Sequence, residues 1–288
     1  MPRAVMSRRL LAVACTLVPA GSFAPTARSN RRLVSACEML AEYESMSYRE
    51  LQRACKDRGL RAVGRAPELL ERLRAEPPPA ALCVDGGDPS FGSHAELVAA
   101  LHELRGDPLD GEAHGSPRMV THRGPASARV AVIGEAPGAD EDRLGEPFVG
   151  RAGRLLDEMF TCAGFAREEL YVTNLVKRRP PANRDPTPAE IAFYAPWLME
   201  ELRLVAPRIV VTTGRLSMRA VLSEPRPISR VRGTWYAPDA LACGAWGMPI
   251  FHPAYLLRNP SPDPGTPKSR TWHDVQEIRR KFDELAAG

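Results

Sequence analysis

The stretch VAVIGEAPGADEDRLGEPFVGRAG, residues Val130–Gly153, decides the fold class of this chain. It begins with Val130–Ile133, a short apolar run of the kind found in buried parallel strands. A helical pattern starts at Arg151, and glycines and carboxylates fill the segment between. The glycines are typical of a phosphate-binding loop, but no Gly-Lys-Ser/Thr follows, and the carboxylates lack the spacing of metal ligands. The stretch therefore predicts a buried strand, a polar loop and a helix.

On either side of this stretch the chain shows a regular alternation of short apolar segments and helical patterns. The longest helical pattern has a clear start, with Thr187 at the N-cap, Pro188 at the first helical position and Glu190 at the third. The alternation predicts a three-layer α/β/α sandwich with a mostly parallel central sheet. Further strands are expected in LYVTNLV (170–176), RIVVTTG (208–214) and GMPIFHP (247–253), and helices at 94–105, 151–164, 187–207, 215–222 and 272–286.

Polar residues stand at the carboxyl end of each expected strand. They are Gly134 and Glu135, Asn174, Thr212 and Thr213, and His252. In sheets of this kind ligands bind beyond the carboxyl ends of the strands. The sequence therefore predicts one site to which all four strands contribute.

Three motifs carry a family resemblance. GEAPGADEDRLGEPFVGRAG, YVTNLVKRRPPANRDPTPAE and FHPAYLLRNP, in this order and spacing, resemble family 4 uracil-DNA glycosylases over roughly 119–285. The resemblance implies cleavage of the N-glycosidic bond of uracil in DNA, which leaves an abasic site. It also implies uracil-containing DNA as the partner, and we expect a monomer without membrane association in its mature form.

The residues of these motifs suit that chemistry. A flipped base can stack on Phe148, and the amide of Asn174 can donate and accept hydrogen bonds along a pyrimidine edge. His252 can donate to uracil O2 and stabilise the leaving anion. Gly134 lets the backbone approach the base, and Asn183 matches a second family asparagine. The alternatives are a core phenylalanine, a turn-capping asparagine and a histidine that caps a loop.

The sequence leaves several candidates for the residue that positions the attacking water. This chain has Ala136, as family 4 enzymes do, at a position where a related glycosylase family has an aspartate. The acidic residues nearby are Glu135, Asp140, Glu141 and Asp142, of which we favour Glu135 and Glu141 as catalytic residues. The alternative for this acidic run is a solvated turn or a helix N-cap.

Apolar and basic residues around the motifs are expected to contact DNA. Leu256 and Leu257 follow the His-Pro pair and are candidates for a wedge that fills the gap left by the flipped base. The alternative is that these two leucines begin a core helix. The basic side chains expected at phosphates are Arg258, Lys177, Arg178, Arg179 and Arg184.

The chain departs from the family at its cofactor. Family 4 enzymes usually hold a [4Fe–4S] cluster on four cysteines, and this resemblance places two of them at Arg178 and Tyr194. The remaining C-x-x-C pair belongs before the first strand, where GDPLDGEAHGSP (106–117) has no cysteine. Thiolates hold such clusters, so we predict no cofactor here, with packing in its place. Tyr194 is expected to fill part of the vacated space. Loss of the cluster in a decaying enzyme is the alternative.

The first 37 residues have the composition of a targeting sequence. They carry six arginines and no acid, so the remaining residues hold 33 basic and 35 acidic side chains and no strong overall charge. An apolar segment at 10–20 with a small-residue cleavage pattern is followed by an Arg- and Ser-rich segment. This order resembles a bipartite plastid presequence, with a mitochondrial or plain secretory sequence as alternatives. No later run is apolar enough to span a membrane.

A small helical module is expected at 43–76, before a Pro- and Gly-rich linker at 77–93 and the glycosylase-like domain at 94–288. Ser47 and Glu50 fit a capping box. The segment YRELQRACKDRGL…GRAPELLERL resembles a SAP motif, a helical hairpin that usually binds DNA, with a solvated helical pair as the alternative. Its inner face is expected to hold Leu51, Ala54, Cys55, Leu69, Leu70 and Leu73, and its basic face Arg49, Arg53, Lys56, Arg58, Arg61 and Arg65.

Two other functions compete with uracil excision. One is a non-catalytic DNA-binding protein that retains the fold, and the other is a glycosylase for another deaminated or mismatched base. A phosphotransfer function is disfavoured, because the glycine-rich loop lacks Gly-Lys-Ser/Thr and no paired Mg²⁺ aspartate is present.

Overall fold

The computed structural model describes residues 47–57, 62–75, 89–111 and 116–287. The predicted targeting sequence at 1–37 and most of the predicted linker lie outside this range. Within it, no helix combines the length and apolarity that crossing a lipid bilayer requires.

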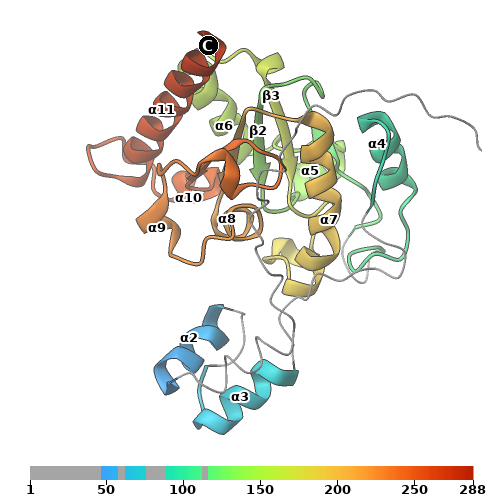
Figure 1. Cartoon of the computed structure of the whole chain (residues 1–288), viewed down its shortest axis with the longest axis vertical. Helices are drawn as coiled ribbons and strands as arrows, with labels where there is room; N and C mark the ends of the chain where they lie inside the picture. Colours follow the sequence, from blue (N-terminus) through green and yellow to red (C-terminus); the bar gives the residue numbers. More distant parts are fainter. Residues whose placement is uncertain (1–46, 58–61, 76–88, 112–115, 288) are drawn as a thin grey trace, which may run out of the picture.

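A five-stranded sheet forms the centre of the larger part (Figure 1). The strands lie in the order β1-β3-β2-β4-β5, and all neighbours are parallel except β1 with β3. Gly134 at the end of β2 is paired with Asn174 at the end of β3. The bounds are β1 His122–Arg123, β2 Val130–Gly134, β3 Leu170–Asn174, β4 Ile209–Thr213 and β5 Trp246–Ile250.

Helices cover both faces of the sheet, which confirms the predicted three-layer α/β/α sandwich. Ala131 and Ile133 of β2 pack with α7 (Pro188–Val205) and α8 (Arg215–Leu222). The alternate residues Val130 and Val132 pack with helices on the other face. Those helices are α6 (Arg151–Cys162), α10 (Pro253–Arg258) and α11 (Pro267–Ala287). The short α9 (Ile228–Val231) adds Val231 to the core on the α7 face, whereas α4 (His94–Glu103) and α5 (Ala139–Leu144) add no buried residue to either cluster. Short 3₁₀ turns lie at Arg167–Glu169, Pro181–Asn183 and Pro238–Ala240.

Some element ends differ from the expectation. The capping box of α7 is confirmed, because the Thr187 hydroxyl accepts from the Glu190 N–H and the Glu190 carboxylate accepts from the Thr187 N–H. The last strand ends at Ile250 rather than His252, since a proline at the first helical position starts α10 at Pro253. The two-residue β1 was not expected from the sequence.

The helical hairpin predicted before the linker is confirmed as α2 (Tyr48–Asp57) and α3 (Ala66–Ala75). Leu51 and Leu69 are buried between the helices together with Cys55. The Ser47–Glu50 capping box forms as expected. The side chains of Ala54 and Leu73 lie outside the described residues.

Candidate active site

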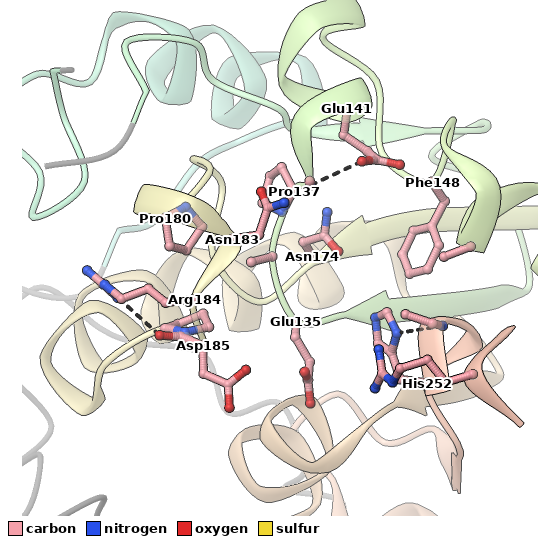
Figure 2. Close-up of a pocket in the computed structure, with 16 residues that line it drawn as sticks. Glu135, Pro137, Glu141, Phe148, Asn174, Pro180, Asn183, Arg184, Asp185 and His252 are labelled. Atoms are coloured by element: carbon pink, nitrogen blue, oxygen red, sulfur yellow. Dashed lines mark hydrogen bonds between the residues drawn. The ribbon is translucent and has the colours of Figure 1, made fainter. Parts of the chain in front are cut away.

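A cavity of about 440 Å³ opens at the carboxyl ends of the central strands (Figure 2). It lies where β3 and β4 flank β2, with the connecting helices on opposite faces of the sheet, as expected for a site in this fold. Eight of the predicted residues line it: Glu135, Glu141, Phe148, Asn174, Asn183, Arg184, His252 and Arg258. Lys177, Arg178, Leu256 and Leu257 do not line it.

Gly134 allows two side chains to meet at the cavity wall. A methyl group on Gly134 would collide with the amide oxygen of Asn174 and lie 2.6 Å from the Phe148 ring. Phe148 has a left-handed backbone with φ of 57°, and a side chain at Gly153 would collide with its carbonyl. The chain therefore holds the Phe148 ring in place at the cost of an unfavourable backbone conformation.

His252 faces Phe148 across the cavity, with ring centroids 6.1 Å apart and planes inclined by 29°. It is the N-cap of α10, where its Nδ1 accepts a hydrogen bond from the Ala254 N–H at 3.1 Å. Burial lowers the pKa of His252 to about 4, the charge of Arg258 acts in the same direction, and Asp185 opposes them. The ring is therefore neutral at pH 7, and its proton resides on Nε2 because Nδ1 is an acceptor.

Glu135 is held at the start of α8. Its Oε1 accepts from the Leu216 N–H at 2.7 Å, and a side chain at Gly214 would collide with it. Burial raises the pKa of Glu135, and hydrogen bonding to the Leu216 amide opposes this. The carboxyl group thus has a fixed position at the edge of the cavity.

Asp185 is a cavity residue that the sequence analysis missed. It points to the same side of the cavity as Glu135 (Figure 2). Its negative charge adds to the rise that burial causes in the pKa of Glu135, and it opposes the lowering that burial causes in the pKa of His252. Only its place two residues after Asn183 could have indicated it. Its carboxylate pairs with exposed Arg215 at 3.1 Å.

The Glu141 carboxylate forms hydrogen bonds to the backbone of its own segment. Its two carboxylate oxygens accept from the backbone N–H groups of Gly138 and Gly150, at 3.1 and 2.8 Å. Gly138 is the N-cap of α5, so for Glu141 this arrangement favours the helix N-cap alternative over water positioning.

Lys177 and Arg178 were predicted to contact phosphates, and the structure shows that this is wrong. Both side chains are buried, with exposed fractions of 0% and 1%. Lys177 pairs with Glu201 at 2.5 Å and donates to the backbone oxygen of Asn174 at 3.0 Å. Arg178 pairs with Asp107 at 2.7 Å. Buried charges need such partners, so neither group can reach DNA.

The two neighbouring arginines of this loop remain closer to the surface. Arg179 donates to the Asn183 side chain at 2.7 Å, and Arg184 forms a bidentate pair with Glu190 at 2.6 and 2.9 Å. Asn183, with φ of 55°, lies at the cavity edge.

The prediction that Leu256 and Leu257 form a wedge is also wrong. Leu256 is buried on α10, and half-buried Leu257 packs against the same apolar core. The exposed apolar residue of α10 is Tyr255, whose ring lies 5.2 Å from that of Phe251. The core-helix alternative therefore describes the two leucines.

Comparisons with known proteins match two family models to this chain. The model of the uracil DNA glycosylase superfamily matches residues 121–276, and the SAP domain model matches residues 42–75. The chain is 41% identical to a type-4 uracil-DNA glycosylase of Archaeoglobus fulgidus, over 48% of this chain and 71% of that protein. It is 40% identical to that of Thermotoga maritima, over 50% and 73%, and 39% identical to that of Saccharolobus solfataricus, over 49% and 68%.

The superfamily match spans more than half of the chain and contains all the cavity residues named above. The chain belongs to the uracil DNA glycosylase superfamily.

Proposed function

We propose that this chain is a uracil-DNA glycosylase, which hydrolyses the N-glycosidic bond of uracil in DNA and starts base excision repair. The curated relatives bear that name. The observation that carries the proposal is the arrangement of Phe148, Asn174 and a neutral, Nε2-protonated His252 around one cavity.

Substrate binding follows from the cavity wall. A base in duplex DNA must be flipped out before a pocket can read it. The Phe148 ring offers a face for stacking, and the Asn174 amide offers a donor and an acceptor to the uracil edge. Because Gly134 has no side chain, Asn174 and Phe148 can both lie against its backbone and present these groups together.

Bond cleavage places negative charge on the departing uracil. His252 donates from Nε2 to uracil O2 and stabilises that charge as it develops. A neutral donor suits this role, since it is already in the required protonation state at pH 7. The developing positive charge on the sugar lies near the carboxylates of Glu135 and Asp185 in this arrangement.

We propose that Glu135 positions the water. Glu135→Gln is expected to lower kcat by about 10²-fold, because a positioned base is lost. Burial raises the pKa of Glu135, so the wild-type rate should fall with decreasing pH earlier than for an ordinary glutamate, and this fall should vanish in the variant. Single-turnover excision across pH 5–9 measures both effects.

Glu141→Gln is the matched comparison for this prediction. It should lower the unfolding midpoint through weaker hydrogen bonds to Gly138 and Gly150, while kcat changes less than in Glu135→Gln. A larger loss of kcat in Glu141→Gln would assign the water to the other carboxylate.

The overall proposal is tested with residues 38–288 and a single uracil in end-labelled DNA, in the presence of a chelator. Alkali should then break the strand at the uracil. A folded protein that binds DNA and yields no abasic site would contradict the proposal and favour the non-catalytic alternative. Cleavage at hypoxanthine but not at uracil would favour a different base.

We propose Tyr255 as the residue that fills the duplex after base flipping. Its side chain is 38% exposed on the helix that His252 caps. Tyr255→Ala should lower kcat/KM about tenfold on duplex DNA and much less on single-stranded DNA, where no gap has to be filled. Leu257→Ala, which removes a core contact, should lower stability and leave the duplex-to-single-strand ratio unchanged. An unchanged ratio in Tyr255→Ala would exclude this role.

We further propose that the SAP-like hairpin tethers the enzyme to DNA. Arg49 and Arg65 are exposed on it, and such side chains give sequence-independent affinity for phosphates. A tether raises the local concentration of the glycosylase domain without changing its base specificity. Deleting 43–76 should weaken DNA affinity more than turnover on saturating short oligonucleotide.

We also propose a monomer that is imported into plastids. Only the composition of residues 1–37 supports the plastid, with the mitochondrion as the alternative. Fusing these residues to a fluorescent protein tests the destination, and light scattering of the mature chain tests the monomer.

A further inference from the structure

The resemblance to family 4 enzymes assigns the ligands of a [4Fe–4S] cluster to Arg178, Tyr194 and a C-x-x-C pair within 106–117. The structure shows what this chain has at those places. Asp107 and Asp110 lie in that segment with two residues between them, the spacing of the missing pair. All four residues meet in one network.

Asp107 is the centre of this network. Its Oδ2 accepts from Arg178 Nε at 2.7 Å, and its Oδ1 accepts from the Tyr194 hydroxyl at 2.5 Å. Asp110 Oδ1 lies 3.4 Å from Arg178 Nη2. Asp107 thereby joins Arg178 and Tyr194, which lie 71 and 87 residues from it in sequence.

Arg178 uses its remaining donors on backbone oxygens. Nη2 donates to Leu104 at 2.8 Å, and Nη1 donates to Ser116 at 3.4 Å and to Pro117. The planar guanidinium has five N–H groups in fixed directions, which suits a site with several acceptors around it. Arg178 therefore ties the end of α4 and the segment before β1 to the loop after β3.

The residues do not fit an iron–sulfur cluster. Arg178 and Tyr194 carry no thiolate, and burial with the Asp107 hydrogen bond raises the pKa of Tyr194, which keeps it a donor. Asp107, Arg178 and Tyr194 are buried, so their side chains already fill the space. In the part of the chain that the structure describes, no three His, Cys, Asp or Glu side chains are grouped for metal binding.

We infer that Asp107, Asp110, Arg178 and Tyr194 replace the cluster as an ion-pair network and position the loop between β3 and α7. This loop brings Pro180, Asn183 and Asp185 to the cavity. Arg178 anchors the loop itself to Asp107, and Tyr194 anchors the helix that follows it. The inference that the network positions the loop rests on the proposed function, because its effect is on uracil-DNA binding. The inference that the network replaces the cluster does not depend on that function.

The first experiment changes all four residues to cysteine: D107C, D110C, R178C and Y194C in one chain. Anaerobic reconstitution with iron and sulfide should give a brown protein with about four iron atoms per chain, while wild type treated identically takes up none. A folded variant that binds no iron, or a wild type that binds a cluster, would overturn the replacement. Neither result depends on glycosylase activity.

The second experiment measures KM and kcat for uracil DNA, well below the melting temperature. Arg178→Met should raise KM about tenfold with a smaller change in kcat, because the loop that lines the cavity loses its anchor. Tyr194→Phe, which removes one hydrogen bond of the network, should give a smaller change in the same direction.

Arg232→Met is the matched control, since Arg232 pairs with buried Asp274 on elements that contribute nothing to the cavity wall. It should lower the melting temperature and leave KM unchanged. An unchanged KM in Arg178→Met, or an equal rise in both variants, would reduce the network to a general stabilising role and overturn the positioning.

Discussion

Replacing His252 with alanine is expected to lower kcat for uracil excision by about 10³-fold, because the departing uracil loses its hydrogen-bond donor. Binding of uracil DNA should change much less, since stacking on Phe148 and the contacts of Asn174 remain. Single-turnover rates and the affinity of the variant for uracil DNA measure the two effects separately.

A second substitution separates chemistry from helix capping. His252 also caps α10, and loss of an N-cap costs about 1 kcal/mol. Serine can cap a helix but has no imidazole, so His252→Ser should lose as much kcat as His252→Ala while it retains more stability. An alanine variant that excises uracil at the wild-type rate would contradict the mechanism.

The pH dependence of stability gives an independent check on His252. Its pKa is about 4 in the folded chain and near 6.5 when unfolded, so only the unfolded state takes up this proton between those values. Protons bound by the unfolded state favour unfolding, so His252 makes stability fall as pH decreases from about 6.5 to 4. His252→Ser should reduce this slope. His122, with a pKa also lowered to about 4 by burial, leaves a residual slope in the variant.

Removing Glu201 is expected to destabilise the protein by about 3–5 kcal/mol, because a buried lysine is left without its counter-charge. Lys177 and Glu201 are both inaccessible to solvent, and Tyr171 donates to the same carboxylate at 2.5 Å. Glu201→Ala should therefore lower the melting temperature by about 10 °C or more, measured by calorimetry or denaturant unfolding.

Two further variants define the origin of this loss. Glu201→Leu combined with Lys177→Met removes both charges and should recover much of the stability, as apolar replacements of buried pairs do. In Glu201→Ala, the loss should be smaller at high pH, because a neutral lysine is easier to bury. Glu284→Ala, which removes an exposed carboxylate from its pairs with Lys281 and Arg280, is the control and should change little. A loss in Glu201→Ala no larger than in this control would contradict the account.

The fold and the cavity wall were predictable because they depend on local patterns. Short apolar runs separated by helical patterns indicate a parallel sheet, and the polar residues Glu135, Asn174 and His252 follow those runs directly. Because the carboxyl ends of such strands lie at the same edge of the sheet, these three residues were expected to form one site.

The basic residues after β3 show where this reasoning failed. Lys177-Arg178-Arg179 has the appearance of a phosphate-binding run, yet its partners Glu201 and Asp107 lie in distant segments that sequence spacing does not connect. The leucines after His252 failed for a different reason. A proline at the first helical position turned an expected loop into α10, which directed Leu256 inward and Tyr255 outward.

The hydrogen bond between His252 Nδ1 and the Ala254 amide has a consequence for how this pocket can change. The nitrogen that caps α10 accepts a hydrogen bond there, so the ring proton must reside on Nε2. The first turn of the helix therefore fixes the tautomer of His252. Any change that removes this donor, such as a proline at 254, frees Nδ1 to hold the proton, and Nε2 then becomes an acceptor. The pocket would then present an acceptor instead of a donor to uracil O2, although His252 itself is unchanged.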